Sequence, residues 1–131
     1  MAINFSKLEE ITRALKHSKQ TGKCFHTTFA FKGSKLLAIG INNYTKQHPL
    51  HKFGPYKSSK GGDYKAGIHS EVSAIIKLGL EDCSAITFVN LRIDNNNKLA
   101  KSCPCINCQR VLDQLNYKNI WFYDGEKFTK K

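Results

Sequence analysis

SCPCINC, at residues 102–108, places Cys105 and Cys108 three positions apart, directly behind Pro104. Proline suits the first turn of a helix, because the N–H that it lacks would have no partner inside the helix. Two thiols at this spacing project from one face of a helix, so both can reach a single ion. The positive end of the helix also favours thiolate, the form of cysteine that binds zinc. The stretch therefore predicts either a metal site or a redox site at a helix start.

IHSE, at residues 68–71, contributes the imidazole of His69 and the carboxylate of Glu71 at the start of another helical pattern. With His69, Cys105 and Cys108 as ligands, Zn²⁺ would keep an open fourth position, as catalytic rather than structural zinc does. Zinc can lower the pKa of a bound water from 15.7 to about 7, so zinc-bound hydroxide is the expected nucleophile. Glu71 is not needed as a ligand. We expect it to be the catalytic proton shuttle, a role that typically contributes on the order of 10²–10⁴ in rate.

The periodicity of the chain predicts alternating helices and strands around this pair of stretches. Apolar residues at helical spacing predict an opening helix over residues 5–18, with Ser6 and Glu9 as a capping box. Alternating residues on both sides of a Lys-Gly-Ser-Lys turn predict a β-hairpin. The further expected elements are a helix at 68–78, a strand at 85–93, a helix opened by Pro104, a strand at 120–123 and a final strand at 126–129.

The short tail decides how the last strand runs. After Tyr123 only eight residues remain, whereas a helical crossover to a parallel strand needs at least about ten to twelve. The pair Asp124-Gly125 is a hairpin turn signal. The final strand is therefore expected to be antiparallel.

Residues 43–67 follow neither period and are expected to form a substrate-recognition loop. They hold five lysines, one acidic residue and four aromatic residues. Basic side chains interleaved with aromatic ones suit a ligand that has a phosphate and a base to stack. His51, Lys52 and Lys57 are the candidate substrate contacts. The alternative is a solvated insert without a ligand.

Composition bounds the partners and the compartment. The 131 residues fit one domain over 1–131, and the formal charge of +11 favours nucleotides or nucleic acid as partners. Neither a signal peptide nor an apolar run of membrane length is evident, so a cytoplasmic protein without a membrane partner is expected. Five cysteines, an odd number, fit a reducing compartment better than a disulfide framework.

His69-x-Glu71 followed by Pro104-Cys105-x-x-Cys108 resembles the zinc-dependent cytidine and deoxycytidylate deaminase superfamily. The resemblance implies a three-layer α/β/α fold with a mixed sheet of about five strands and, in the nucleoside branch, an antiparallel C-terminal hairpin. It also implies that His69, Cys105 and Cys108 hold zinc, that Asn42 contacts the sugar, and that the protein forms a homo-oligomer. The chain departs from the nucleoside enzymes in carrying Tyr44 where they commonly have glutamate. Its size and His48-Pro49 are similar to small bacteriophage deaminases.

These features favour hydrolytic deamination of a cytosine base in a free nucleoside or nucleotide. The alternatives are deamination of a base within RNA or DNA, and a purine deaminase. A nucleic-acid-binding module with a structural zinc is a non-enzymatic alternative, and a redox dithiol is another. Structural zinc would need a fourth ligand, for which the candidates are Cys24, Cys83, Cys103, His48 and His51.

Overall fold

The computed structural model describes residues 3–19, 25–42, 69–79, 83–104 and 106–131. Two strands, β1 (Phe25–Lys32) and β2 (Lys35–Ile41), form the predicted hairpin. Gly33 occupies its turn with φ of +62°, a conformation that glycine adopts without the steric cost of a Cβ. The loop predicted at 43–67, with His51, Lys52 and Lys57, lies outside the described residues.

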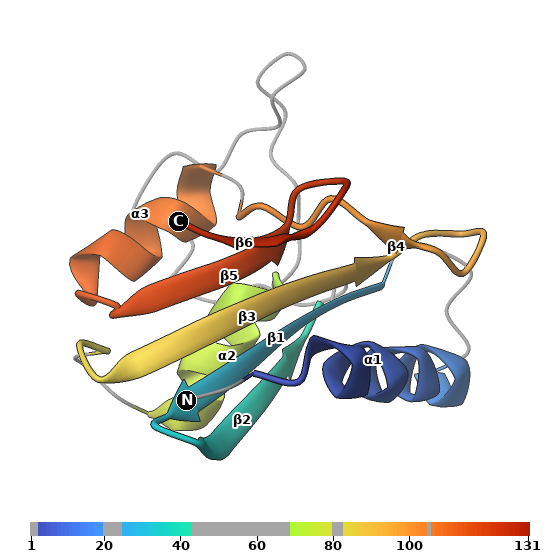
Figure 1. The fold of residues 1–131 in the computed structure, drawn as a ribbon. Helices are drawn as coiled ribbons and strands as arrows, with labels where there is room; N and C mark the ends of the chain where they lie inside the picture. Colours follow the sequence, from blue (N-terminus) through green and yellow to red (C-terminus); the bar gives the residue numbers. More distant parts are fainter. Residues whose placement is uncertain (1–2, 20–24, 43–68, 80–82, 105) are drawn as a thin grey trace.

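The sheet grows from β1 on its other side. β3 (Ile86–Ile93) pairs antiparallel with β1, and β5 (Asn119–Tyr123) pairs parallel with β3. β6 (Phe128–Lys130) returns antiparallel to β5 after a turn at Asp124, so the predicted direction of the last strand is confirmed. The two-residue β4 (Leu99–Ala100) pairs with β3 and brings the sheet to six strands, in the order β2-β1-β3-β5-β6 with β4 off this path (Figure 1).

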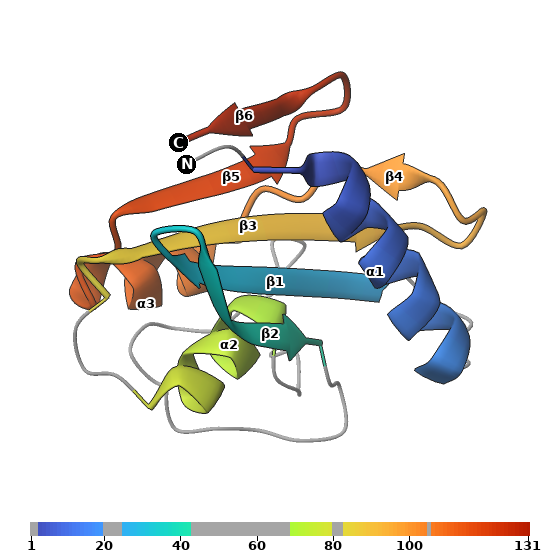
Figure 2. The same cartoon turned by 60° about the horizontal axis from the view of Figure 1, so that its bottom comes forward.

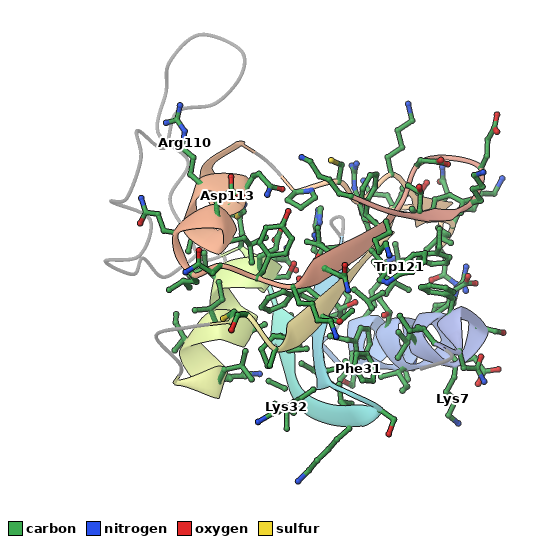
Figure 3. The ribbon with its side chains drawn as sticks, turned by 60° about the vertical axis from the view of Figure 1, so that its left-hand side comes forward. Lys7, Phe31, Lys32, Arg110, Asp113 and Trp121 are labelled. Carbon is green, nitrogen blue, oxygen red and sulfur yellow. The ribbon has the colours of Figure 1, made fainter. Side chains whose placement is uncertain are left out.

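Helices cover both faces of the sheet. Helix α1 (Phe5–Lys19) lies on one face, whereas α2 (Ser70–Leu78) and α3 (Ile106–Gln114) lie on the other (Figure 2). Figure 3 shows the same layers from the side, with Arg110 and Asp113 projecting from α3 away from the sheet. The arrangement is the predicted three-layer α/β/α architecture. In the described part of the chain, no helix is both long and apolar enough to cross a membrane.

The core has two halves because successive side chains of β3 point to opposite faces. Phe88 packs under α2 and α3 with Ala74, Ile75, Val111, Leu112 and Ile120. Val89 and Leu91 pack under α1 with Leu8 and Phe29. All residues of β3 except Arg92 are buried, as expected of a central strand covered on both faces.

Two helix starts differ from the sequence prediction. Asn4, not Ser6, caps α1: its Oδ1 accepts a hydrogen bond from the Lys7 N–H at 3.1 Å, and Ser6 lies inside the helix. Helix α3 begins at Ile106, so Pro104 precedes the helix instead of opening it. Before Pro104, the Ser102 N–H donates to the Tyr123 carbonyl of β5, and the Ser102 Oγ accepts the Tyr123 N–H, so this part of the chain is held against the sheet.

Candidate active site

The first turns of α2 and α3 bring three of the predicted site residues together. His69 is the N-cap residue of α2 and has extended backbone, Glu71 lies in the first turn of α2, and Cys108 comes from the first turn of α3. The Cys108 Sγ lies 3.3 Å from the His69 Nδ1. One ligand atom from each of the three residues lies within 4.8 Å of the others. Glu71 and Cys108 are buried and His69 is half-buried.

The position of α2 depends on a very close approach to β2. A Cβ added at Gly40 would lie 2.1 Å from the Ser70 carbonyl oxygen and 2.4 Å from the Ala74 nitrogen. Only a residue without a side chain allows the backbone of α2 to approach the strand so closely. At its other end, α2 stops at Gly79, whose left-handed backbone lets its N–H bond to the Ile75 and Ile76 carbonyls.

The Glu71 carboxylate is held by two polar side chains. Ser70 Oγ donates to Glu71 Oε1 at 3.1 Å, and Asn90 Nδ2 of β3 donates to Glu71 Oε2 at 3.1 Å. The Thr28 hydroxyl of β1 joins these partners, at 2.9 Å from Ser70 Oγ and 2.7 Å from Asn90 Oδ1. Glu71, Ser70, Thr28 and Asn90 thus form a closed, buried ring of polar contacts, called the carboxylate ring below.

Ser102 connects this ring to the cysteine-bearing segment. Its carbonyl accepts a second hydrogen bond from Asn90 Nδ2 at 3.3 Å, and its Oγ donates to the Asn90 carbonyl at 2.8 Å. The same Oγ accepts the Tyr123 N–H at 2.8 Å. Ser102 therefore fixes the start of the segment that leads to Cys108 against both β3 and β5.

The donor set fits zinc. An imidazole nitrogen and a thiolate sulfur are typical zinc ligands, and a carboxylate oxygen is also one. The carboxylate ring engages both oxygens of Glu71. Cys105, the third predicted ligand, lies outside the described residues. Of the candidate fourth ligands within those residues, Cys83 is buried in the core and Cys103 is exposed, and neither belongs to the group.

Asn42, the predicted sugar contact, has a structural role in the hairpin. Its Oδ1 accepts the His26 N–H at 3.1 Å, and its own N–H donates to the His26 carbonyl at 3.3 Å. These two bonds continue the pairing of β1 and β2 by one residue.

Sequence reasoning missed the residues that surround Glu71. Thr28, Ser70, Asn90 and Ser102 are all buried and polar. One of them carries a signal in the sequence: Asn90 interrupts the apolar strand, between Val89 and Leu91. A buried amide costs free energy unless it is hydrogen-bonded, so such an interruption indicates a specific polar partner.

No family model and no curated protein sequence matches this chain. Among solved structures, the chain is similar to the crystal structure of cytidine deaminase from Mycobacterium leprae, with a TM-score of 0.55. The match covers 98% of this chain and 94% of that one at 14% sequence identity. The chain has the cytidine deaminase fold. The likeness in fold extends over essentially the whole chain.

Proposed function

We propose that this protein is a zinc-dependent deaminase that hydrolyses the exocyclic amine of a cytosine base in a free nucleoside or nucleotide. The observation that carries the proposal is the convergence of His69, Glu71 and Cys108 within 4.8 Å on a cytidine deaminase fold. A fold alone does not imply an activity. The site adds groups with suitable chemistry: an imidazole and a buried thiol that can bind a metal, and a hydrogen-bonded carboxylate that can transfer protons.

His69 and Cys108, together with Cys105, would hold the zinc ion. When bound, this ion lowers the pKa of a coordinated water and so supplies a nucleophile at neutral pH. Glu71 is assigned a different role, because His69, Cys105 and Cys108 already supply the three protein ligands that a catalytic zinc needs. Its two oxygens accept hydrogen bonds from Ser70 and Asn90, which orient the carboxylate beside these ligands. Glu71 carries one proton of the water to the ring nitrogen of the base and, in a second transfer, carries the other proton of the water to the departing amine.

The reaction consumes one water molecule and releases ammonia. A C–O bond forms and a C–N bond breaks at the same ring carbon, with no change in oxidation state. Cytosine becomes uracil. One proton of the water leaves on the ammonia, and the other remains on the ring nitrogen of the product. In this cycle the Glu71 carboxyl is the group that takes up and releases the protons.

The carboxylate ring suits a group that gains and loses a proton. Ser70 and Thr28 each have one hydroxyl hydrogen, whereas three oxygen–oxygen contacts run from Glu71 through Ser70 and Thr28 to Asn90. When Glu71 is ionised, Ser70 donates to it. When Glu71 carries a proton, Glu71 can donate to Ser70, and the Ser70 hydrogen turns to Thr28. The carboxyl therefore keeps its partners in both states.

The expected substrate is a mononucleoside or mononucleotide, recognised through residues 43–67. Its candidate contacts there are His51, Lys52 and Lys57, and a substrate that carries phosphate would use the lysines. A base within RNA or DNA is the second candidate, and the formal charge of +11 favours it. Binding to a polynucleotide releases several counterions and weakens steeply with salt, whereas binding to a nucleoside does not.

A substrate panel tests the proposal. Zinc-loaded protein is incubated with nucleosides and mono- and triphosphates of cytosine, adenine and guanine, and with single-stranded oligonucleotides, and the released ammonia is measured. We expect ammonia from a cytosine nucleoside or nucleotide, at a rate that changes little between about 50 and 200 mM salt. Ammonia from oligonucleotides alone, with a steep loss over this salt range, would favour the second candidate. Zinc-loaded protein that releases ammonia from no member of the panel contradicts the proposal.

A further inference from the structure

Asn90 is an exception among the residues of β3. Its strand is buried on both faces, and the side chain next to it on the same face, Phe88, belongs to the apolar core under α2 and α3. Asn90 is itself only 3% exposed. An amide at such a place is unfavourable unless its hydrogen bonds are made, because burying an unpaired polar group costs free energy.

Each polar atom of the Asn90 side chain has a partner from a different part of the fold. The two hydrogens on Nδ2 go to Glu71 Oε2 at 3.1 Å and to the Ser102 carbonyl at 3.3 Å. Its Oδ1 accepts the Thr28 hydroxyl hydrogen at 2.7 Å. One rigid amide on a central strand thus contacts α2, β1 and the segment that leads to Cys108.

These contacts fix the Glu71 carboxylate in two directions. Ser70 precedes Glu71 on the same helix turn, so its bond to Oε1 moves with α2. Asn90 belongs to the sheet, so its bond to Oε2 ties the carboxylate directly to β3, and through the second hydrogen of the amide to the Ser102 segment. Removing the Asn90 amide would remove this direct hydrogen bond and keep the bond from Ser70 of the same helix.

We propose that Asn90 is a positioning residue for Glu71, which holds the Oε2 oxygen so that the carboxyl lies at one fixed place beside His69 and Cys108. The inference deepens the proposed function and rests on it for its kinetic consequence. Asn90 touches neither the substrate nor the metal ligands in this account, and it acts through Glu71. Its loss should therefore lower kcat and leave KM nearly unchanged, because the interaction supports proton transfer and not substrate binding.

The kinetic test compares Asn90→Ala with a matched control, Thr27→Val. Thr27 neighbours Thr28 on β1 and is also fully buried, but its hydroxyl pairs with Thr12 under α1 at 2.8 Å, on the opposite face of the sheet. We expect Asn90→Ala to lose about 10- to 100-fold in kcat, with KM changed by less than about threefold. Thr27→Val should keep kcat within about twofold. Equal effects of the two substitutions on kcat would overturn the proposal, because loss of a buried polar contact alone would then explain both.

A second readout does not depend on turnover. The equilibrium constant for unfolding is measured in urea for the wild type, Asn90→Ala, Glu71→Ala and the double variant. If Asn90 holds Glu71, the effects of the two substitutions are coupled. The unfolding constant of the double variant is then about five- to tenfold smaller than the value expected for two independent effects. If the unfolding constant of the double variant lies within about twofold of the value expected for independent effects, the proposed contact between Asn90 and Glu71 is refuted. If Asn90→Ala does not fold, Asn90→Ser replaces it in both tests with the same expectations.

The two tests separate this inference from the proposed function. If the wild-type protein releases no ammonia but Asn90 and Glu71 are strongly coupled, the proposed deaminase activity is overturned and the positioning of Glu71 by Asn90 stands. If the wild-type protein is active, but Asn90 and Glu71 are not coupled and Asn90→Ala keeps its kcat, the deaminase activity stands and the role of Asn90 is overturned.

Discussion

Replacing Gly40 with alanine should displace the first turn of α2 and with it His69 and Glu71. The new Cβ would lie 2.1 Å from the Ser70 carbonyl oxygen, whereas ordinary contacts of a Cβ are 3.4–4 Å. Both nearby residues, Ser70 and Ala74, meet it with backbone atoms, so no side-chain rotation can relieve the clash. The strand and the helix must therefore separate by more than about 1 Å, which exceeds what closely packed interiors accommodate without cost.

This separation would break the contacts that locate Glu71. The contact between the Thr28 and Ser70 hydroxyl oxygens is 2.9 Å long and would be broken if α2 moved by that amount. Overpacking typically costs about 1–3 kcal/mol, and a clash between two backbones belongs at the upper end. We expect Gly40→Ala to lower the free energy of unfolding by about 3 kcal/mol. Zinc affinity and kcat should fall as well.

Urea unfolding, zinc content and ammonia release check this expectation, with Gly33→Ala as the control. Gly33 also favours glycine, because its backbone in the β1–β2 turn has a φ of +62°. Unlike Gly40, it has room for a side chain: a Cβ there meets no atom within 4 Å. Its substitution should cost about 1–2 kcal/mol through backbone strain and leave zinc content and kcat unchanged. If Gly40→Ala were as stable and as active as the wild type, the close approach of α2 to β2 would not be what places the site.

Further expectations concern the thiol, the Ser102 bridge and one turn. Cys108→Ser should lose the bound metal, because the buried thiol is one of the proposed zinc ligands, whereas the exposed Cys103→Ser should retain it; metal analysis after gel filtration distinguishes them. Ser102→Ala should lower the free energy of unfolding by about 2–3 kcal/mol, since the Tyr123 N–H loses its partner, whereas the exposed Ser34→Ala should change it by less than about 0.5 kcal/mol. The pKa of Asp94 is lowered from 3.8, mainly because the Lys98 N–H donates to its carboxylate. This stabilisation is present above about pH 4 and is lost as the pH falls through the lowered pKa, so Asp94→Asn should weaken the acid sensitivity of urea unfolding in that range.

Local patterns allowed much of the fold to be predicted from the sequence. The 3.6-residue period located α1, and the short tail after Tyr123 correctly required an antiparallel last strand. The pairing of a His-x-Glu stretch with a Cys-x-x-Cys stretch led to an α/β/α deaminase-like fold, which is confirmed. The first two features were accessible because they depend on residues close together in the chain, and the third because the paired motif resembles that of a known family.

What the sequence did not reveal depends on contacts between distant elements. Gly40 lies in an ordinary apolar run, and its importance appears only when α2 packs on β2. Asn90 and Ser102 lie twelve positions apart and meet because Ser102 turns back onto β3 and β5. Pro104 is a residue that favours a helix start, but it precedes α3, and the neighbouring Ser102 is hydrogen-bonded to Tyr123 of β5. In each case packing, not local preference, decides the outcome.

The central claim is that Glu71 moves protons beside a metal held by other residues. The most direct measurement is the ammonia released from a cytosine nucleoside or nucleotide by wild-type and Glu71→Gln protein, with the zinc content of each sample measured alongside. The account predicts one zinc per chain in both proteins, with ammonia from the wild type and a loss of at least about 10²-fold in Glu71→Gln. Undiminished ammonia release by Glu71→Gln, or loss of its zinc, would contradict the account.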